Sequence, residues 1–569
     1  MKMAQVGIFL DRKVAEDRWK YGLNVFEGYY SEILSHAGIP FQVLDQKEQI
    51  GDSKLDLLIV ALEADDEETA AAIWKFAELG GVVISYGGLN KLAKKLNCTI
   101  RSSGCAGYAD VSELSDIPEG LRYLQAVPWT IDHVGANRSI GLAGLLHQGE
   151  PSGKVLGPAK ISFSVGKGVI ERWAVQLMST IVGFQQGTMP ILKDGIPAPD
   201  GTANVDEGIL KADDGIELDW ELDRVITETG NPYFSLPYAD LWREVLISQL
   251  LKSAIAKGLT LPFLGAWPKG ISHVAMISHD SDLNEDVTAV TTLDVLKQAQ
   301  IQSTWCMIEP GYSPFIYERV KQEGHELAFH YNAVSMDNGH WGEEEFQRQL
   351  NWFKEATGET EAVSNKNHYT RFEGWGELYE WCETHGISSD QTRGPSKMGN
   401  VGFLFGTCQP YFPIAWWNQQ NRLYDLLEIG FLTQDMDIGC WADTTVIEPF
   451  LQQVKRVEGV AHFLFHQVHL HHTKEAHAAL LTFVAKAKDS GFTFWTGKQI
   501  NDWVRARRKV NIKGFDASGE IVLQGLDEAP EVIVWIPVLN NESIPSSEHI
   551  EVRYGVKCIK QQAAYPISK

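Results

Sequence analysis

The sequence predicts an α/β protein built around a distorted (β/α) barrel, with a parallel-sheet domain before it and a small β appendage after it. Three observations support this prediction. Apolar runs of strand length alternate with helical patterns over residues 4–97, the same alternation resumes over 274–508, and residues 510–569 change to the two-residue period of antiparallel strands. At 569 residues, the chain is too long for a single core.

Residues 1–235 are predicted to form the first domain. We expect its strands at 5–10, 41–44, 55–62 and 81–85, and its helices at 24–37, 67–79 and 87–96. Short β-like runs at 161–165 and 169–175 are interpreted as a β-rich extension of this domain, followed by a loop rich in acids over 194–219. Gly87 and Gly88 favour a tight turn, although such a turn could also hold a phosphate or a sugar.

Residues 236–270 are predicted to connect the two larger units through a helix at 237–257 and a linker rich in proline and glycine. The barrel is assigned to 271–508 and the antiparallel β domain to 509–569. Barrel strands are expected at 274–278, 303–308, 326–329 and 462–465, and barrel helices at 290–300, 314–323, 343–356 and 475–489.

Composition excludes several classes of partner. The formal charge of −24 and the pI near 5.2 argue against binding to nucleic acid or to anionic lipid, because both require clustered positive charge. No apolar run approaches the length of a membrane span, and no leader peptide is recognisable, so we expect a cytoplasmic protein without a membrane partner. Seven scattered cysteines fit reduced thiols.

The candidate catalytic and metal-binding residues lie at predicted strand ends of the barrel. The run VAMISHDSD ends in Asp280 and Asp282, two carboxylates that need a cation or hydrogen bonds if they are buried. Of 17 histidines, 13 lie between His273 and His477, and His330 and His466 each follow an apolar run. Any one of these groups is more often structural. Several of them at one barrel mouth predict a metal site with nitrogen and oxygen ligands.

These segments, in this order, resemble the motifs of the polysaccharide deacetylase (NodB-homology) superfamily, carbohydrate esterase family 4. The resemblance covers roughly residues 270–508. Its motifs are SHDSD, GHELAFH, NHYTRF, GFLFGTCQPYFP and HFLFHQVHL, followed by FWTGKQINDW. It implies a distorted barrel of the deacetylase type and a metal-dependent hydrolase that removes acetyl groups from an N- or O-acetylated saccharide.

The resemblance also implies roles for particular residues. Asp280 would be the general base, Asp282 and His330 metal ligands, and His466 the general acid. Arg371 would balance Asp280, with Lys366 as the alternative. The metal would be divalent, most simply Zn, with Co, Ni or Mn also suited to imidazole and carboxylate ligands.

One position departs from the family pattern. The family places a second histidine four residues after the first, and that position here is Val334, which cannot bind a metal. We expect a relocated third ligand, His368 as the first choice and His340 as the second, against the alternative of a damaged site. His325 is a poor candidate, because five residues along a strand place it at the opposite end.

Four further residues are expected to contact the substrate: Tyr331, Asn332, Trp441 and His469. Two other functions stay open, a non-catalytic glycan-binding or scaffold protein and an amide hydrolase with a non-carbohydrate substrate.

The stretch GGVVISYGGLNKLAKKL resembles the flavodoxin-like domain of class I glutamine amidotransferases and the related domain of β-galactosidase-like proteins. In the catalytic members a cysteine follows such a strand, whereas Ser85 or Tyr86 holds that place here. The resemblance therefore implies the fold without the amidotransferase reaction. In the non-catalytic alternative, the N-terminal domain would be an oligomerisation surface through which a homo-oligomer forms.

Overall fold

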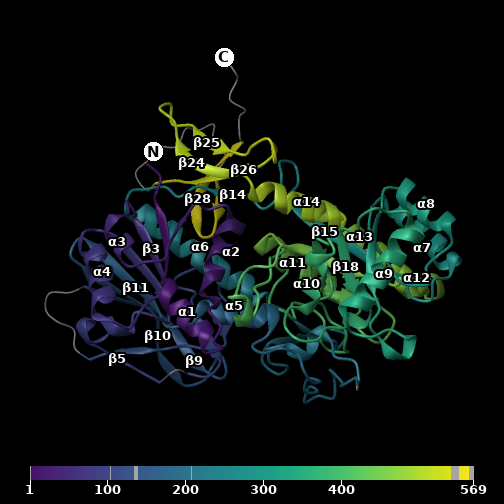
Figure 1. Ribbon diagram of the computed structural model, residues 1–569, viewed down its shortest axis with the longest axis horizontal. Helices are drawn as coiled ribbons and strands as arrows, with labels where there is room; N and C mark the ends of the chain where they lie inside the picture. The colour runs from purple at the N-terminus through teal and green to yellow at the C-terminus, as the bar shows by residue number, and fades with distance from the viewer. Residues whose placement is uncertain (1, 103, 133–138, 207, 540–549, 563–569) are drawn as a thin grey trace.

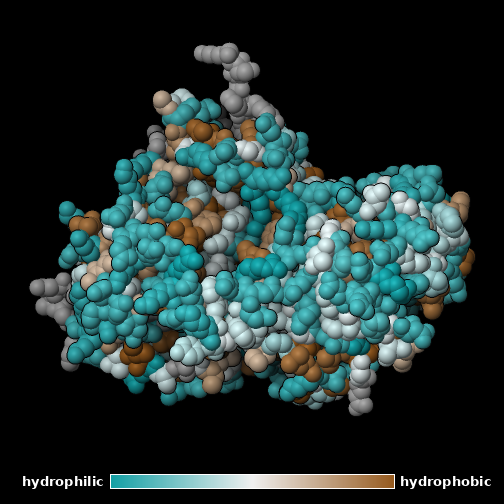
Figure 2. Space-filling model, viewed as in Figure 1, coloured by the Kyte–Doolittle hydropathy of each residue, from teal (hydrophilic) through white to brown (hydrophobic). Residues whose placement is uncertain are grey.

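The computed structural model confirms the α/β class and describes residues 2–102, 104–132, 139–206, 208–539 and 550–562 (Figure 1). The N-terminal sheet lies on one side, the barrel on the other, and the C-terminal strands above the N-terminal sheet. Figure 2 shows a largely hydrophilic face, as the net charge of −24 suggests. None of the described helices is long and apolar enough to cross a membrane.

The N-terminal sheet has nine strands in the order β2-β1-β3-β4-β11-β10-β9-β6-β7. Its parallel half consists of β1 (Val6–Leu10), β2 (Gln42–Leu44), β3 (Leu57–Leu62), β4 (Val82–Tyr86) and β11 (Gly168–Trp173). Its antiparallel half consists of β10 (Val155–Val165), β9 (Ile140–Gln148), β6 (Gly107–Asp110) and β7 (Leu121–Tyr123). The expected β-rich extension thus continues the same sheet through β11.

Four helices accompany the parallel strands: α1 (Arg12–Lys20), α2 (Tyr30–Ala37), α3 (Glu48–Asp52) and α4 (Glu67–Glu78). Helix α5 (Leu177–Gln186) follows β11. The helix expected at 87–96 was wrong, since only two single-turn 3₁₀ segments form there, Asn90–Leu92 and Lys94–Leu96. Leu89 and Asn97 adopt positive φ on either side of them, which a continuous α-helix does not allow.

Helix α6 (Tyr238–Ala256) joins the N-terminal sheet to the barrel and is buried on nearly all sides. This burial explains why its sequence is apolar around much of the helix. One of its acidic groups is satisfied by neighbouring residues. The buried Asp240 carboxylate accepts hydrogen bonds from the Thr407 hydroxyl and from the backbone N–H groups of Cys408 and Gln409. Elsewhere in this region, Glu32 on α2 pairs with both terminal nitrogens of Arg508.

The barrel sheet runs β20-β19-β18-β17-β16-β15-β22-β21, with β23 also paired to β15, and all its pairs are parallel. Its strands are β15 (His273–Asp280), β16 (Thr304–Met307), β17 (Glu326–Tyr331), β18 (Ser364–Asn367), β19 (Ser389–Asp390), β20 (Leu427–Glu428), β21 (Thr433–Gln434), β22 (Val460–Leu464) and β23 (Phe492–Phe494). β20 and β21 end the described sheet, so the barrel is curled but open.

Helices cover the outside of this barrel. They are α7 (Asp286–Ala299), α8 (Pro314–Gln322), α9 (Glu343–Thr357), α10 (Glu377–Thr384), α11 (Ile447–Val457), α12 (Gln467–His472), α13 (Lys474–Asp489) and α14 (Gly497–Arg508). Because all the strands are parallel, their carboxyl ends meet at one mouth, where the site residues were expected.

The C-terminal strands form an antiparallel sheet in the order β14-β26-β28-β27. Its members are β26 (Ile533–Pro537), β27 (Ile550–Arg553), β28 (Val556–Gln562) and β14 (Phe263–Leu264), the last from the predicted linker. A separate hairpin joins β24 (Asn511–Phe515) to β25 (Ile521–Gln524). The linker is therefore part of this sheet.

Candidate metal centre at the barrel mouth

Strand β15 extends two residues further than the apolar pattern predicted and ends at Asp280. Side chains alternate along a strand, so His279 faces away from Asp280. The Nδ1 of His279 donates a hydrogen bond to the Phe465 carbonyl at 2.8 Å. Burial lowers the pKa of His279 to about 3, so this imidazole is neutral and structural. Asp282 follows two residues beyond the strand end.

Asp282, His330 and His368 converge at the mouth. The distance from Asp282 Oδ1 is 3.7 Å to His330 Nε2 and 3.4 Å to His368 Nδ1. These three residues form a group whose ligand atoms all lie within 4.8 Å of one another. Ligands about 2.1 Å from one tetrahedral cation are separated from each other by about 3.4 Å. The geometry therefore suits a single divalent cation, and His368 is the third residue of this group.

In both histidines of this group, the ring nitrogen that faces away from the other ligands contacts a neighbouring residue, which orients the ring. His330 Nδ1 donates to the Lys366 carbonyl at 2.8 Å, which directs Nε2 into the mouth. His368 Nε2 lies 3.6 Å from Asp337 Oδ2, and the Asn332 amide donates to the same oxygen at 3.3 Å. Such outer contacts fix the tautomer and the ring orientation of metal-ligating histidines.

Two buried atoms of the group fit a metal on independent grounds. Within the described residues, neither Asp282 Oδ1 nor His330 Nε2 has a hydrogen-bond partner. Buried polar atoms without a partner are costly, and a coordinated cation would satisfy both. The donor set of two imidazoles and one carboxylate is typical of zinc and similar metals. The residues present therefore fit the divalent metal that the sequence predicts.

Asp280 lies beside this group and pairs with the ammonium group of a buried lysine. Lys366 is fully buried, and its Nζ lies 3.3 Å from Asp280 Oδ1 and donates to Ser278 Oγ at 3.2 Å. Burial alone would raise the pKa of Asp280. Lys366, with smaller contributions from His330 and His466, outweighs burial and lowers this pKa below its ordinary value. Asp280 is therefore ionised at neutral pH.

The expected partner of Asp280, Arg371, is placed elsewhere. Its guanidinium pairs with Glu373 and donates to the Gly208 carbonyl. Arg371 follows the short turn His368–Thr370, in which Tyr369 and Thr370 both have positive φ. This turn carries the chain away from the mouth after His368. Lys366, the alternative partner, contacts Asp280 instead. Lys366 lies on β18, which pairs with β17 in the barrel sheet.

His466 completes the mouth and is held by Asp435, a residue that the sequence analysis missed. Asp435 accepts hydrogen bonds from the backbone N–H and from Nδ1 of His466. His466 Nε2 points to the carboxylates, 4.0 Å from Asp280 Oδ2 and 3.6 Å from Asp282 Oδ2. Burial opposes protonation, but Asp435, Asp282 and Asp280 together raise the pKa of His466 to about 10. His466 is therefore a positively charged imidazolium at neutral pH.

The four residues expected to contact substrate have different surroundings. The expectation for Tyr331 was wrong, because alternation along β17 turns it away from His330 into a cluster with Phe346, and its hydroxyl donates to the His340 carbonyl at 2.6 Å. Asn332 contacts Asp337, as described above. His469 Nε2 lies 4.0 Å from Asp435 Oδ2, and Trp441 packs half-buried against the core beyond β21.

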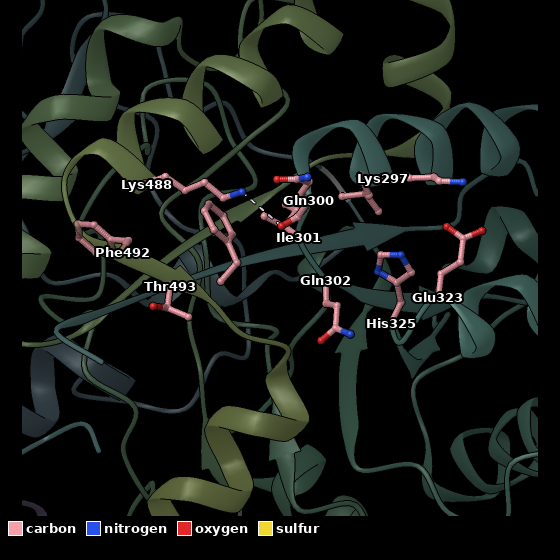
Figure 3. A pocket seen from close by; sticks show the side chains of 11 residues that line it. Lys297, Gln300, Ile301, Gln302, Glu323, His325, Lys488, Phe492 and Thr493 are labelled. Carbon is pink, nitrogen blue, oxygen red and sulfur yellow. Dashed lines mark hydrogen bonds between the residues drawn. The ribbon is translucent and has the colours of Figure 1, made fainter. Parts of the chain in front are cut away.

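The two other histidines considered as third ligands lie outside the group. His340 is exposed. His325 lies at the opposite end of the barrel, as predicted, where it lines a cavity of about 780 Å³ together with Glu323 and Lys297 (Figure 3). Its Nδ1 accepts a hydrogen bond from the Ser303 backbone N–H.

The strand-end rule that found Asp280 and His466 did not find Asp435, although Asp435 also lies at a strand end. Asp435 follows β21 directly, but β21 has only two residues and gives no apolar run to recognise. Lys366 lies in the middle of the four-residue strand Ser364–Asn367, whose side chains are all polar and all buried. No hydrophobic pattern marks such a strand.

Replacing Lys366 with Met is expected to move the acidic limb of the kcat/KM pH profile to higher pH. Lys366 lowers the pKa of Asp280, so its removal raises that pKa, and the carboxylate form is lost at a higher pH. The measurement is acetate release against pH. Arg371→Met is the matched control and should leave the limb in place. A shift in the Arg371 variant alone would contradict the structure.

The contact of Asp435 with His466 predicts a pH-dependent stability of the metal-free protein. The pKa of His466 rises from 6.5 to about 10, so the stabilisation is fully present below pH 6.5 and is lost as the pH rises through 10. Asp435→Asn should lower the thermal midpoint most near pH 6 and least near pH 10. A difference in midpoint that does not change with pH would refute this prediction.

No protein-family model and no curated protein matches this sequence. Solved structures do resemble parts of it. A protein assigned as a polysaccharide deacetylase from Mycobacterium smegmatis is 16% identical, with a TM-score of 0.33, and the match covers 43% of this chain and 94% of that one. The Xyl-CE4 domain of a multidomain xylanase from the hindgut metagenome of Trinervitermes trinervoides is 14% identical (TM-score 0.25; 40% and 89% covered).

A β-galactosidase from Bacillus circulans sp. alkalophilus is 13% identical, with a TM-score of 0.25, and the match covers 32% of this chain and 30% of that one. Parts of this chain are thus similar to solved structures of polysaccharide deacetylases and of β-galactosidases.

Proposed function

We propose that the barrel is a metal-dependent hydrolase that removes acetyl groups from an N- or O-acetylated saccharide. The observation that carries this proposal is the convergence of Asp282, His330 and His368 beside an ionised carboxylate, Asp280, and a protonated imidazole, His466. A metal site with a base on one side and an acid on the other suits the hydrolysis of an ester or an amide.

A divalent cation bound to Asp282, His330 and His368 would polarise the acetyl carbonyl and acidify water. Asp280 takes a proton from the attacking water as its oxygen bonds to the carbonyl carbon. Lys366 keeps the Asp280 carboxylate ionised and in place. His466 gives the proton on Nε2 to the departing nitrogen or oxygen as its bond to carbon breaks, and Asp435 stabilises the protonated ring before that step.

The surroundings of the mouth support a polar substrate. His469 is about two-fifths exposed beside Asp435, and Tyr369, about half exposed, lies edge-on to His368 at a ring distance of 4.5 Å. An exposed aromatic ring next to a metal ligand is a suitable surface for one face of a sugar ring. We infer that the sugar next to the acetyl group lies between Tyr369 and His469.

The test is acetate release from acetylated xylo- and chito-oligosaccharides. Protein loaded with Zn, Co or Mn should release acetate, lose this activity on chelation and regain it when metal is restored. Asp282→Asn should bind no stoichiometric metal and release no acetate. If fully metal-loaded protein released no acetate from any acetylated saccharide, the proposal would be wrong.

A further inference from the structure

The barrel exposes its large apolar side chains at one end only. Within residues 271–508, all of which the structure describes, each of them follows the carboxyl end of a strand, in the connecting loop or in the first turn of the next helix. Exposed apolar residues are normally scattered, and a gathering of them marks a site of interaction. The side chains at this end are Leu283, Val287, Phe315, Met336, Tyr369 and Met398.

Two of these residues directly follow candidate metal ligands. Leu283 comes after Asp282, and Tyr369 comes after His368. The ligand atoms of Asp282 and His368 lie 3.4 Å apart, so both apolar residues belong to the edge of the mouth. Both also have positive φ, 66° for Leu283 and 55° for Tyr369. Glycine or asparagine adopts this conformation at lower cost, so the turns themselves do not require a large apolar side chain.

Met336 brings a third apolar side chain to the same edge. It precedes Asp337, whose Oδ2 lies 3.6 Å from His368 Nε2. Met336 is 77% exposed and Leu283 is 72% exposed, so packing within the protein explains neither of them. Contact with a bound molecule would remove both from water, which is favourable for apolar surface.

Val287 and Phe315 extend the apolar surface away from the metal centre. They lie in the first turns of α7 and α8, and α7 begins only four residues after Asp282. The Ser313 backbone N–H donates to Asp286 Oδ1 at 2.9 Å, which ties the starts of the two helices together. We call the four side chains outside the sugar contact the apolar rim: Leu283, Val287, Phe315 and Met336.

The loops around the apolar rim are acidic. Residues 281–286, 308–314 and 332–342 contain five acidic side chains and no lysine or arginine. These charges repel an anionic lipid surface or a lipid carrier that contains phosphate. They do not oppose an uncharged alkyl chain. The chemistry of the rim therefore fits a molecule that is apolar and neutral.

We propose that the substrate of the barrel is a neutral amphipathic glycoside, an acetylated sugar joined to an alkyl chain, and that the chain lies on the apolar rim. The rim borders the metal centre, so its occupant reaches the mouth together with the acetyl group. A sugar between Tyr369 and His469 covers none of the four rim side chains, and an alkyl aglycone does. This assignment rests on the proposed hydrolase function and adds the class of aglycone.

The test compares the octyl and methyl β-glycosides of N-acetylglucosamine, both as monomers, on the full-length protein. Calorimetric titration of the metal-free protein should give at least about tenfold tighter binding of the octyl glycoside, because its chain buries methylene groups on the rim. With zinc-loaded protein, the octyl glycoside should also have the higher kcat/KM for acetate release. Equal binding of the two glycosides, or no binding of the octyl glycoside, would overturn the proposal.

Variants of the apolar rim locate the chain. Asparagine tolerates the positive φ at position 283, so Leu283→Asn should fold normally. Leu283→Asn and Phe315→Ser should each reduce the ratio of the two dissociation constants by about threefold. Leu79 is the matched control, a leucine of the same 72% exposure at the end of α4, and Leu79→Asn should keep the full ratio. A ratio that stays unchanged in both rim variants would refute the rim.

Binding and acetate release separate this proposal from the hydrolase function. Acetate release with equal kcat/KM from both glycosides would refute the alkyl chain and leave the hydrolase intact. No acetate release from any acetylated saccharide, with octyl binding still dependent on the rim, would refute the hydrolase and support the alkyl chain. Binding to phosphatidylcholine vesicles without binding of the monomeric octyl glycoside would assign the rim to a bilayer and overturn the proposal. A dimer that Phe315→Ser dissociates would overturn it in favour of a second copy of the chain.

Discussion

Asp280→Asn is expected to lower kcat for acetate release by about 10²–10⁴-fold, the usual contribution of a general base. Asparagine keeps the shape of the side chain but cannot accept the proton of the attacking water. The metal ligands Asp282, His330 and His368 are unchanged, so the variant should still bind metal. The measurements are kcat on an acetylated oligosaccharide and metal content after dialysis.

Because Asp280 is buried beside Lys366, the Asp280→Asn change is also expected to lower the stability of the protein. Lys366 would face a neutral amide in place of its carboxylate, and a buried charge without its partner is costly. The double variant Asp280→Asn with Lys366→Met removes both charges and should recover stability without recovering activity. Full activity in Asp280→Asn would show that another group is the base.

His368→Ala is expected to weaken metal binding by about 100-fold or more, because even the outer partners of metal ligands contribute 10–100-fold. The change removes one of three converging ligands and leaves Asp282 and His330 in place. Metal affinity is measured by competition with a chromophoric chelator. Activity at limiting metal should fall in parallel and should be partly restored at high metal concentration.

His340→Ala is the matched control for this prediction. His340 was the second candidate for the third ligand, and it is exposed outside the group, so its loss should leave metal affinity unchanged. Asp337→Asn should have a smaller effect than His368→Ala, because Asp337 only orients the His368 ring. If His368→Ala kept full metal affinity, the relocated ligand would be wrong.

Much of the fold could be predicted because its strands and helices have clear periods. The alternation in residues 4–97 and 274–508 predicted parallel strands in both regions. The structure has them throughout the barrel sheet and in one half of the mixed N-terminal sheet. The failures have local causes. Residues 87–96 carry a helical pattern, but positive φ at Leu89 and Asn97 limits them to single turns. The linker strand β14 is only two residues long and depends on β26 for its pairing.

The candidate site could be predicted only where strand ends are visible in the sequence. Asp280, Asp282, His330 and His466 follow apolar runs, and the structure brings them together with His368. The partners of the proposed base and acid are Lys366, on the short polar strand β18, and Asp435, directly after the short polar strand β21. Their contacts are with residues distant in sequence. Tyr331 was misplaced because the alternation of one strand was not applied to it.

The central claim is that Asp282, His330 and His368 hold one catalytic divalent cation. Its most direct test is a crystal structure of zinc-loaded protein with anomalous diffraction recorded at the zinc edge. The account predicts a single strong anomalous peak about 2.1 Å from one Asp282 oxygen, His330 Nε2 and His368 Nδ1. A peak elsewhere, for instance between Asp435, His466 and His469, or no peak in fully loaded crystals, would contradict the account.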